Sequence, residues 1–396
     1  MFDRAERHYH RAWDIQARLL GPDHETTLAV RNNYVWTVVT QGRRPDAEGL
    51  AQAALDDSTR TLGESHAETG KASNNLSEVF LHTARYDEAV VLRRRALGIM
   101  VAALGPGDER TLEVANDLGV ALITAGRPAE AIPILRATAD HRRQLDPRNL
   151  EYATVLNNLG GGLIGAGQFA EAEAPLREAV ARRTAAIGAD FQGTLAARNL
   201  LGYAQEGQGR WAEAESSYLA VLADRRRVAG PGRPDMYVLR TVGFLARLYA
   251  KQERWPDAAR YLAELILAEK PGPGRTIDNI APPLATALDQ ATAPAGAGAV
   301  LREAHEVVKM RMWKGDWLTA EVGSRYGDCL RRQGEYAEAE PILLAAAAEI
   351  DKAVGVPPRG VAAARRRMID LYTAWGKPAE AAKWQKAFAE LTADQK

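Results

Sequence analysis

Apolar and polar residues along this chain follow a helical period in pairs of stretches separated by short breaks. One such pair predicts helices over about 66–84 and 86–104. The apolar positions are Leu76, Val79 and Phe80 in the first stretch, and Leu92, Ala96 and Ile99 in the second. Spacings of three and four residues place such side chains on one helix face. We therefore expect two amphipathic helices of about 16 residues, each ~24 Å long.

The boundaries of these helices carry start and stop signals. Ser65, followed three residues later by Glu68, indicates a capping box at the start of the first helix. The first helix should end near Ala84, where most other units carry Gly, the usual residue at a helix C-terminus. Leu104-Gly105-Pro106 ends the second helix and begins the next unit.

The helix pair repeats along the whole chain. A short phrase marks each second helix: Gly, any residue, a ring or Pro, two residues, then Ala. The alanines are Ala47, Ala89, Ala131, Ala172, Ala214, Ala258, Ala339 and Ala381. They are 41 to 44 residues apart except for one step of 81, which predicts a degenerate unit near Ala299. Ala5 fits the same register, so residues 1–20 read as the second half of a unit.

The small residue, aromatic and Ala of this phrase resemble the tetratricopeptide repeat (TPR). The 42-residue period, the LGPDH-type start and the paired asparagines resemble the kinesin-light-chain type of TPR. The resemblance implies an all-α fold, a right-handed α-α superhelix of about nine helix pairs plus an N-terminal half-repeat. Repeat physics leads to the same architecture, because each pair buries its faces against its neighbours. We expect aromatic side chains to fill the gaps between neighbouring pairs, namely Tyr86, Phe169, Trp211, Trp255 and Tyr336.

The repeat divides the chain into three predicted segments. Residues 1–269 form the N-terminal TPR array, and 270–300, rich in Pro, Gly and Ala, form a degenerate repeat or hinge. Residues 301–396 form the C-terminal repeats. This last part resembles the TPR tail behind the kinase domain of bacterial serine/threonine protein kinases. The kinase motifs themselves, such as HRD and DFG, are absent from the sequence.

Composition excludes several classes of protein. Lys+Arg and Asp+Glu both number 51, so the zero net charge argues against a nucleic-acid partner. The sequence has neither an apolar run long enough for a membrane span nor a signal peptide, which favours a cytoplasmic bacterial protein. Cys329 is alone, and no catalytic, metal or cofactor motif is found. We expect Cys329 to be a small core residue, and we expect no enzyme activity, no metal and no cofactor.

A ladder of asparagines is the main candidate for function. Asn32, Asn74, Asn116, Asn157 and Asn199 share one slot of the first helix, and a second asparagine follows as Asn33, Asn75 and Asn158. Helix interiors disfavour Asn, so the recurrence needs a reason. The TPR resemblance implies that this slot faces a concave groove, where amides can bond the backbone of an extended peptide. The alternative is that one Asn of each pair braces the neighbouring repeat.

Charged residues flank the ladder with mixed signs. Lys71 and Glu113 lie one helical turn before it, and Glu78 lies one turn after it, so no single charge is indicated for a ligand. Arginine runs end several second helices, at 142–143, 182–183 and 225–227. We interpret these runs as positive charges that complement the helix dipole. The alternative, a basic stripe that binds phosphate, conflicts with the zero net charge.

One glycine-rich stretch imitates a nucleotide loop. Residues 160–165 match GxGxxG but fall inside a predicted helix, whereas a dinucleotide loop must follow a strand. Gly160 shares its slot with Ser77, Gly119 and Gly202, so close helix packing is the preferred explanation.

The leading hypothesis from sequence is a non-enzymatic scaffold that binds a partner protein or an extended peptide in its groove. The second hypothesis is a regulatory or docking region of, or a relative of, a bacterial serine/threonine protein kinase. The half-repeat at 1–20 leaves an apolar face uncovered. It therefore predicts fraying, self-association or an upstream domain.

Overall fold

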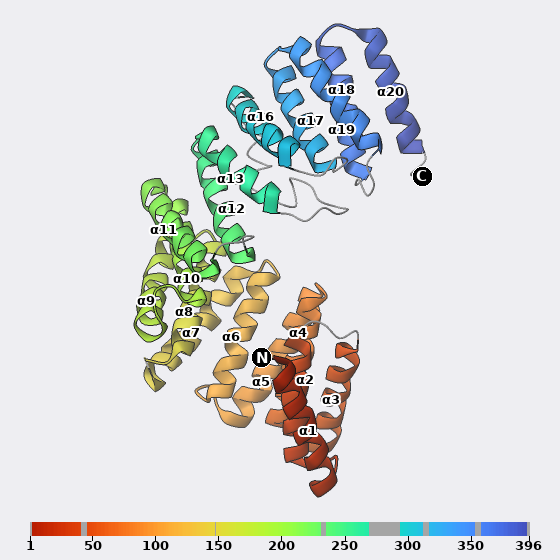
Figure 1. Cartoon of the computed structure of the whole chain (residues 1–396). Helices are drawn as coiled ribbons and strands as arrows, with labels where there is room; N and C mark the ends of the chain where they lie inside the picture. Colours follow the sequence, from red (N-terminus) through yellow and green to blue (C-terminus); the bar gives the residue numbers. More distant parts are fainter. Residues whose placement is uncertain are drawn as a thin grey trace. The chain divides into compact units, whose positions relative to one another are not determined.

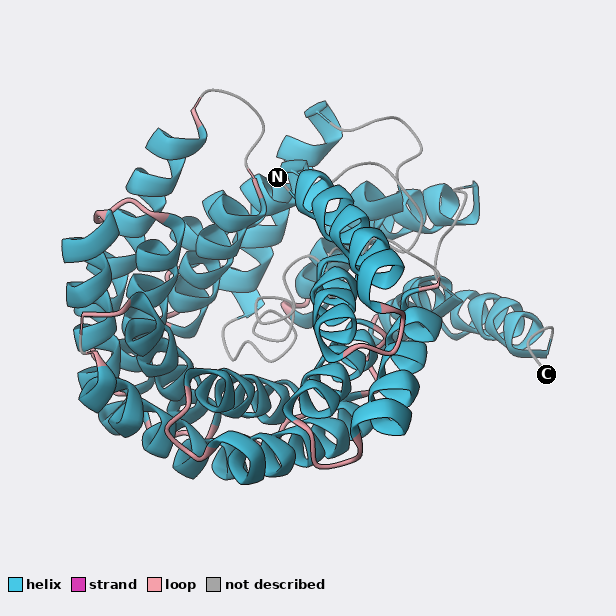
Figure 2. Cartoon of the chain, turned by 90° about the horizontal axis from the view of Figure 1, so that it is seen from below, coloured by secondary structure: helices cyan, strands magenta, loops and turns pink. Residues whose placement is uncertain are grey.

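The computed structural model describes residues 2–40, 46–146, 148–230, 235–268, 294–311, 317–352 and 358–393. The described secondary structure is entirely helical, and short loops join the helices (Figure 2). The helices, labelled in Figure 1, are α1 (Phe2–Leu20), α2 (Glu25–Thr40), α3 (Ala47–Leu62), α4 (Ala67–His82), α5 (Tyr86–Leu104), α6 (Glu109–Thr124), α7 (Pro128–Leu145), α8 (Leu150–Gly165), α9 (Phe169–Ile187), α10 (Gln192–Gly207), α11 (Trp211–Ala229), α12 (Met236–Lys251), α13 (Trp255–Ala268), α16 (Pro294–Arg311), α17 (Trp317–Arg332), α18 (Tyr336–Lys352), α19 (Pro358–Ala374) and α20 (Pro378–Ala393).

The helices confirm the predicted all-α repeat architecture. Within each part of the chain, first helices pack against the second helices that follow them, as in α2 with α3, α4 with α5, α8 with α9, α12 with α13 and α17 with α18, and α1 packs against α2. The eight alanines of the repeat phrase, from Ala47 to Ala381, are all buried; Ala89, Ala131 and Ala172 are 0 % exposed. The predicted degenerate unit near Ala299 contributes α16, within which Ala299 lies.

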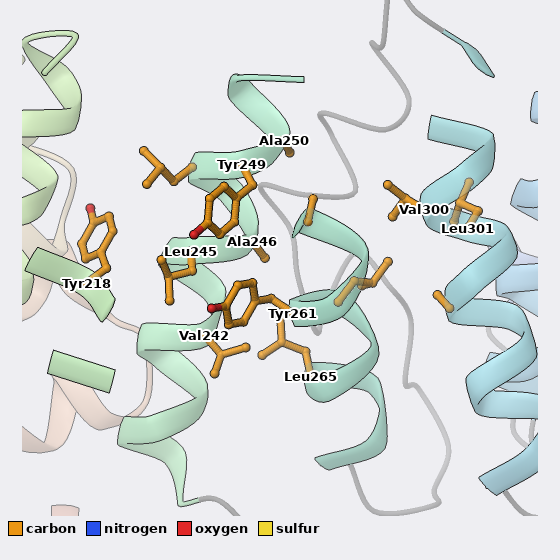
Figure 3. Packing of buried hydrophobic residues seen from close by; sticks show 14 of the residues in the cluster. Tyr218, Val242, Leu245, Ala246, Tyr249, Ala250, Tyr261, Leu265, Val300 and Leu301 are labelled. Carbon is orange, nitrogen blue, oxygen red and sulfur yellow. The ribbon is translucent and has the colours of Figure 1, made fainter. Parts of the chain in front are cut away.

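The chain divides into two compact units, Met1–Arg210 and Trp211–Lys396. The hinge that we predicted at 270–300 falls largely outside the described residues. On either side of it, α13 and α16 pack together in the second unit. Figure 3 shows this core, in which Tyr249 stacks on Tyr261 at a centroid distance of 5.7 Å. Cys329 is buried in the same core, as predicted, and burial raises the pKa of its thiol.

The start of α4 differs from the prediction by one residue. His66, rather than Ser65, is the N-cap, and its ring Nδ1 accepts a hydrogen bond from the backbone N–H of Glu68 at 3.2 Å. The capping box from Ser65 to Glu68 was therefore wrong. His24 occupies the same slot of the preceding unit and accepts from the N–H of Thr26 at 3.2 Å. Histidine replaces the usual Ser or Asp because its ring nitrogen is also an acceptor.

The predicted close packing at Gly160 is confirmed. A Cβ atom added to Gly160 would lie 2.4 Å from Cγ of Leu176, so α8 and α9 approach too closely there for any side chain. Gly119 faces Leu135 in the same way, at 2.6 Å, between α6 and α7. The GxGxxG match thus lies inside α8, where its glycine allows helix contact and forms no nucleotide loop.

Phe169 and Tyr336 fill gaps between consecutive helix pairs, as predicted, whereas Tyr86 and Trp211 are 38 % and 37 % exposed, and the side chain of Trp255 is outside the described residues. Phe169 of α9 lies against Gly207 of α10 and near the ring of Tyr203, at a centroid distance of 6.4 Å. Tyr336 stacks on Trp375 of the following pair at 6.0 Å. On α1 the apolar side chains of Tyr9, Ile15 and Leu19 are exposed, as expected for an isolated second helix.

Candidate functional site

The asparagine ladder lies on α2, α4, α6, α8 and α10 of the first unit. We call the surface formed by its slots and by the positions one helical turn on either side the groove face. Asn32 and Asn199 are buried, with 0 % and 3 % of their surface exposed. Asn74, Asn116 and Asn157 are half-buried. The members of the ladder therefore differ in how closely a ligand can approach them.

The second asparagine of each pair connects neighbouring repeats. Asn75 donates from its side-chain amide to the backbone carbonyl of Asn32 at 2.9 Å. Asn158 donates to Oδ1 of Asn116 at 2.9 Å. Oδ1 of Asn33 accepts from the ammonium group of Lys71 at 2.6 Å. Each of these bonds joins a first helix to the next one, which is the geometry of a brace.

The first asparagines also use their amide N–H groups. Asn32 donates to the backbone carbonyl of Glu68 at 3.0 Å and to its carboxylate at 2.9 Å. Asn74 donates to Oδ2 of Asp117 at 3.0 Å. The side-chain carbonyls of Asn32, Asn74 and Asn157 are buried and have no hydrogen-bond partner among the described residues. An unsatisfied buried acceptor costs about 1–3 kcal/mol, so these oxygens are expensive unless a donor reaches them.

A buried arginine organises the space between α4 and α6, and sequence reasoning missed it. Arg93 of α5 is 2 % exposed. Its Nε donates to Oγ of Ser77 at 2.8 Å, and its guanidinium also bonds the carboxylate of Glu78 and the backbone carbonyl of Asp117. Glu78, predicted as a groove residue, therefore serves as the partner of Arg93. A sequence signal existed, because Arg93 and Ser77 occupy the slots of Leu176 and Gly160.

Asp117 joins this cluster at an electrostatic cost. Burial raises the pKa of Asp117, although the charge of Arg93 and the hydrogen bond from Asn74 oppose the shift. Desolvation also raises the pKa of Glu113, helped by the negative charge of Asp117, although the Glu113 side chain retains contact with water. The carboxyl groups of Asp117 and Glu113 thus both have raised pKa values beside the ladder, and the buried Arg93 partly offsets the cost at Asp117.

A cavity of about 70 Å³ opens on the groove face beside this cluster. α2 contacts α4, and α6 contacts α8, whereas α4 and α6 have little direct contact, which leaves room between them. The lining residues are Trp36, Ala67, Glu68, Lys71, Asn74, Asn75, Met100, Arg110, Glu113 and Val114. Trp36 is 44 % exposed. Trp36 was not predicted as a site residue, although it holds the slot of Glu78, one turn after the ladder.

The described residues hold no group of His, Cys, Asp or Glu side chains that could bind a metal ion. Among the described helices, none is both long and apolar enough to cross a membrane. The site therefore offers amides, mixed charges and apolar side chains, which can hold a peptide by hydrogen bonds and burial.

Comparison with protein families identifies the repeats. Models described as tetratricopeptide repeat match residues 2–26, 27–68 and 194–235, residues 68–144 and 110–185, and residues 241–275. These matches lie between residues 2 and 275, and the resemblance of the C-terminal part to kinase tails stays a prediction. A search of curated proteins found no match.

Solved structures share the fold at low sequence identity. A Rap protein complexed with competence and sporulation factor is 12 % identical, with a TM-score of 0.51, over 99 % of this chain and 93 % of that one. The apo form of RapI is 8 % identical, with a TM-score of 0.50, over 99 % and 97 %. BtubC (BKLC) from P. vanneervenii is 17 % identical, with a TM-score of 0.49, over 59 % and 94 %. The first two support a shared helical-repeat fold, and none transfers a ligand.

Proposed function

We propose, from the premise that this chain belongs to the tetratricopeptide-repeat family, that its first unit binds an extended peptide segment of a partner protein. TPR proteins are interaction scaffolds, and the groove face carries the features that such binding needs. The observation that carries the proposal is the cavity between α4 and α6, which is lined by both the exposed Trp36 and the half-buried Asn74.

The cavity suits one apolar side chain of the peptide. Met100 and Val114 are buried at 3 % and 4 % exposure, and together with Trp36 they supply the apolar part of the lining. Its volume holds a few water molecules, and an apolar group that displaces them gains from burial at roughly 25 cal/mol per Å². An exposed Trp beside a pocket is also the residue type that often dominates binding energy.

The polar lining suits the peptide backbone. The half-buried side chain of Asn74 lines the cavity, and its buried carbonyl has no partner among the described residues. Lys71 and Arg110 can donate to peptide carbonyls, and Glu68 and Glu113 can accept. Because both charges are present, the cavity itself should select for peptide backbone and an apolar side chain, and it should not select for net charge.

The ladder therefore separates into two proposed roles. We assign peptide contact to Asn74, and to Asn116 and Asn157 where they remain partly exposed. We assign bracing to Asn75 and Asn158, which bond the preceding repeat. Asn32 is fully buried and does not touch the peptide itself. Its role is to hold Glu68 in position through the hydrogen bond between them.

A binding experiment with matched tryptophan variants tests the proposal. The whole chain selects peptides from a random library, and binding of the selected peptides is measured by fluorescence polarisation. Trp36→Ala should weaken binding at least about tenfold, as truncation of an interface Trp often does. Trp211→Ala is the control, because Trp211 is 37 % exposed but lies on α11. Equal affinity of wild type and the Trp36 variant would refute the cavity as the site.

The kinase-linked alternative rests on the C-terminal sequence alone and remains a prediction, as does self-association through α1. For self-association, the exposed Tyr9, Ile15 and Leu19 are the side chains to test. Replacing all three by Ser should leave the sedimentation coefficient unchanged if the chain is monomeric.

A further inference from the structure

A second cavity, of about 470 Å³, lies among α7, α8 and α9 of the first unit. The first helix α8 forms its floor, and the second helices α7 and α9 form its walls. The floor residues are Tyr152, Leu156, Leu159 and Leu163. Their spacings of four, three and four residues place them in one apolar line along α8. This line is about 16 Å long, which corresponds to three helical turns.

The apolar line lies on a different side of α8 from the asparagine ladder. Asn157 follows Tyr152 by five residues, which places it roughly 140° away around the helix axis. α7 and α9 both pack against α8 but have little direct contact with each other, so the gap between them opens onto the line. The cavity is therefore separate from the groove face.

The walls of the cavity are made of small side chains. Ala139 of α7 and Pro175 of α9 line it. In the preceding gap, between α5 and α7, the slot of Ala139 holds Leu97 and the slot of Pro175 holds Ile134. Both of these larger side chains pack against the core of the first unit. The gap between α7 and α9 is therefore wider than the repeat requires.

The floor of the cavity is more apolar than the same slots of the neighbouring first helices. Leu156 occupies the slot of Ala115 in α6 and of Arg198 in α10, and Leu163 occupies the slot of Gln205. All four floor side chains belong to the core of the first unit and are at most 7 % exposed. The cavity is thus an opening into this core, where apolar side chains of a partner can be buried.

The rim of the cavity carries charges of opposite sign on its two walls. α7 contributes Arg136, Asp140 and Arg143, and α9 contributes Glu171 and Glu178. Arg136 and Glu171 pair across the opening at 2.6 Å, and both side chains are about half exposed. Exposed ion pairs contribute little to stability, so charges of a partner can replace them at low cost.

Arg182 adds a positive charge to the α9 wall near one end of the floor. It pairs with Glu178 at 2.7 Å, and its guanidinium carbon lies 4.8 Å from the centre of the Tyr152 ring. With Arg182 included, α9 presents two negative charges and one positive, whereas α7 presents two positive and one negative. A ligand with acidic groups toward α7 and basic groups toward α9 therefore complements the rim.

We propose that this opening docks an amphipathic helix of about three turns from a partner protein. The helix places apolar side chains over the line on α8, acidic side chains along α7 and basic side chains along α9. A helix is the matching shape because the floor has the length and the four-three-four spacing of a helix–helix seam. The opposite charges of the walls select the two edges of the helix. This site does not depend on the proposed peptide groove.

Monomeric, stapled helical peptides test the proposal against the whole chain. All carry a fluorescent label and have leucines at the a and d positions of a heptad. They differ at the flanking e and g positions, with Glu on one edge and Lys on the other, Glu on both, or Lys on both. A fourth peptide has the opposite-charge edges but alanines in the seam. Binding is measured by fluorescence polarisation.

We expect wild type to bind the peptide with opposite-charge edges at least about fivefold more tightly than either peptide with a single charge, because only that peptide complements both walls. Replacing the leucines of the seam by alanines should weaken binding at least about tenfold. The absence of binding to every helix, or equal affinity for the three charge patterns, would overturn the proposal.

A double variant that fills the cavity tests its location. Ala139→Leu with Pro175→Ile installs the residues of the preceding gap and should abolish binding of the helical peptides. Its unfolding temperature should equal or exceed that of wild type, because Pro175 lies inside α9, where proline is unfavourable. Retained binding in this variant would overturn the site.

A double variant of the α9 wall tests the role of charge. Glu171→Lys with Glu178→Lys makes both walls positive and should shift the preference to the peptide with Glu on both edges. This shift is a gain of affinity, which a misfolded chain cannot produce. Glu130→Lys is the matched control, because Glu130 holds the slot of Glu171 in α7 and pairs with Arg94 across the preceding gap at 2.6 Å. A wild-type preference in the double variant, or the same shift in the control, would overturn the proposal.

Two further measurements separate this site from the groove and from self-association. Trp36→Ala should bind the helical peptides like wild type, because Trp36 lies on the groove face. Loss of binding in this variant would place the helices in the groove and overturn the proposal. Sedimentation velocity then compares wild type with the filled variant. A dimer of wild type that the filled variant does not form would make a second copy of the chain the occupant, and would overturn a separate partner.

Discussion

The side-chain amide of Asn158 donates a hydrogen bond to the side-chain carbonyl of Asn116, 2.9 Å away in the preceding repeat. Both residues lie on first helices, and both belong to the asparagine pattern that suggested a peptide ladder. Their bond shows that asparagines of one repeat can satisfy those of the next. A recurring amide is therefore a brace at some slots and remains available to a ligand at others.

The bracing role makes a stability prediction. Asn158→Ala removes the donor to Asn116 and should lower stability by about 1 kcal/mol, the net value of a typical internal hydrogen bond. Asn157→Ala removes a buried carbonyl that has no partner among the described residues and a bond of only 3.5 Å to Asn158. It should change stability by less than about 0.5 kcal/mol. Urea unfolding midpoints followed by circular dichroism measure both, and an equal shift in the two variants would contradict the assignment.

The glycines of α8 allow a matched packing test. Gly160→Ala should destabilise by about 1–3 kcal/mol, because the new Cβ would meet Leu176 at 2.4 Å. Gly161→Ala adds the same atom where nothing lies within 4 Å and should stabilise by up to about 1 kcal/mol. Thermal unfolding distinguishes them.

A second-site change checks the cause of the Gly160 effect. Leu176→Ala should cost less stability in the Gly160→Ala background than in wild type, because it removes the atoms that the new Cβ would meet. If both glycine variants behaved alike, close packing at this slot would not explain the glycine.

The buried carboxyl of Asp117 predicts a pH dependence. Burial raises its pKa in the folded state above the ordinary value of 3.8. The unfolded chain therefore releases this proton at a lower pH than the folded chain. At pH values above the pKa of the folded state, the ionised carboxylate lowers the free energy of unfolding. Asp117→Asn installs the amide found in the same slot as Asn33, Asn75 and Asn158, and should raise the free energy of unfolding at pH 7.

The difference between wild type and Asp117→Asn should shrink as the pH falls toward 3.8, because both states of wild type then bind the proton. Urea unfolding at pH 7, 5.5 and 4 measures it. A variant less stable than wild type at pH 7 would mean that the charge of Asp117 stabilises Arg93 by more than its burial costs.

Periodicity predicted the features that depend on position along a helix. The buried Ala89 and Ala172, the close contact of Gly160 with Leu176 and the burial of Cys329 all follow from slots that repeat with the fold. Such slots face the same neighbour in every unit, so one residue type recurs there.

Pairing between polar neighbours could not be predicted in this way. Whether Asn74 bonds Asp117 or a ligand depends on the distance between α4 and α6, which the spacing of residues does not determine. The burial of Arg93 and Arg142 also depends on how neighbouring repeats close over them. The arginine runs could be seen in the sequence, but not which member of each run is buried.

Photo-crosslinking tests the central claim most directly. A peptide selected by the whole chain is synthesised with benzoylphenylalanine in place of its apolar anchor, crosslinked to the chain and mapped by mass spectrometry. The account predicts crosslinks to residues around the cavity, chiefly Trp36, Met100 and Val114, and their loss in Trp36→Ala. Crosslinks confined to residues away from this cavity, or to residues 211–396, would contradict it, and would leave the asparagines with a purely structural role.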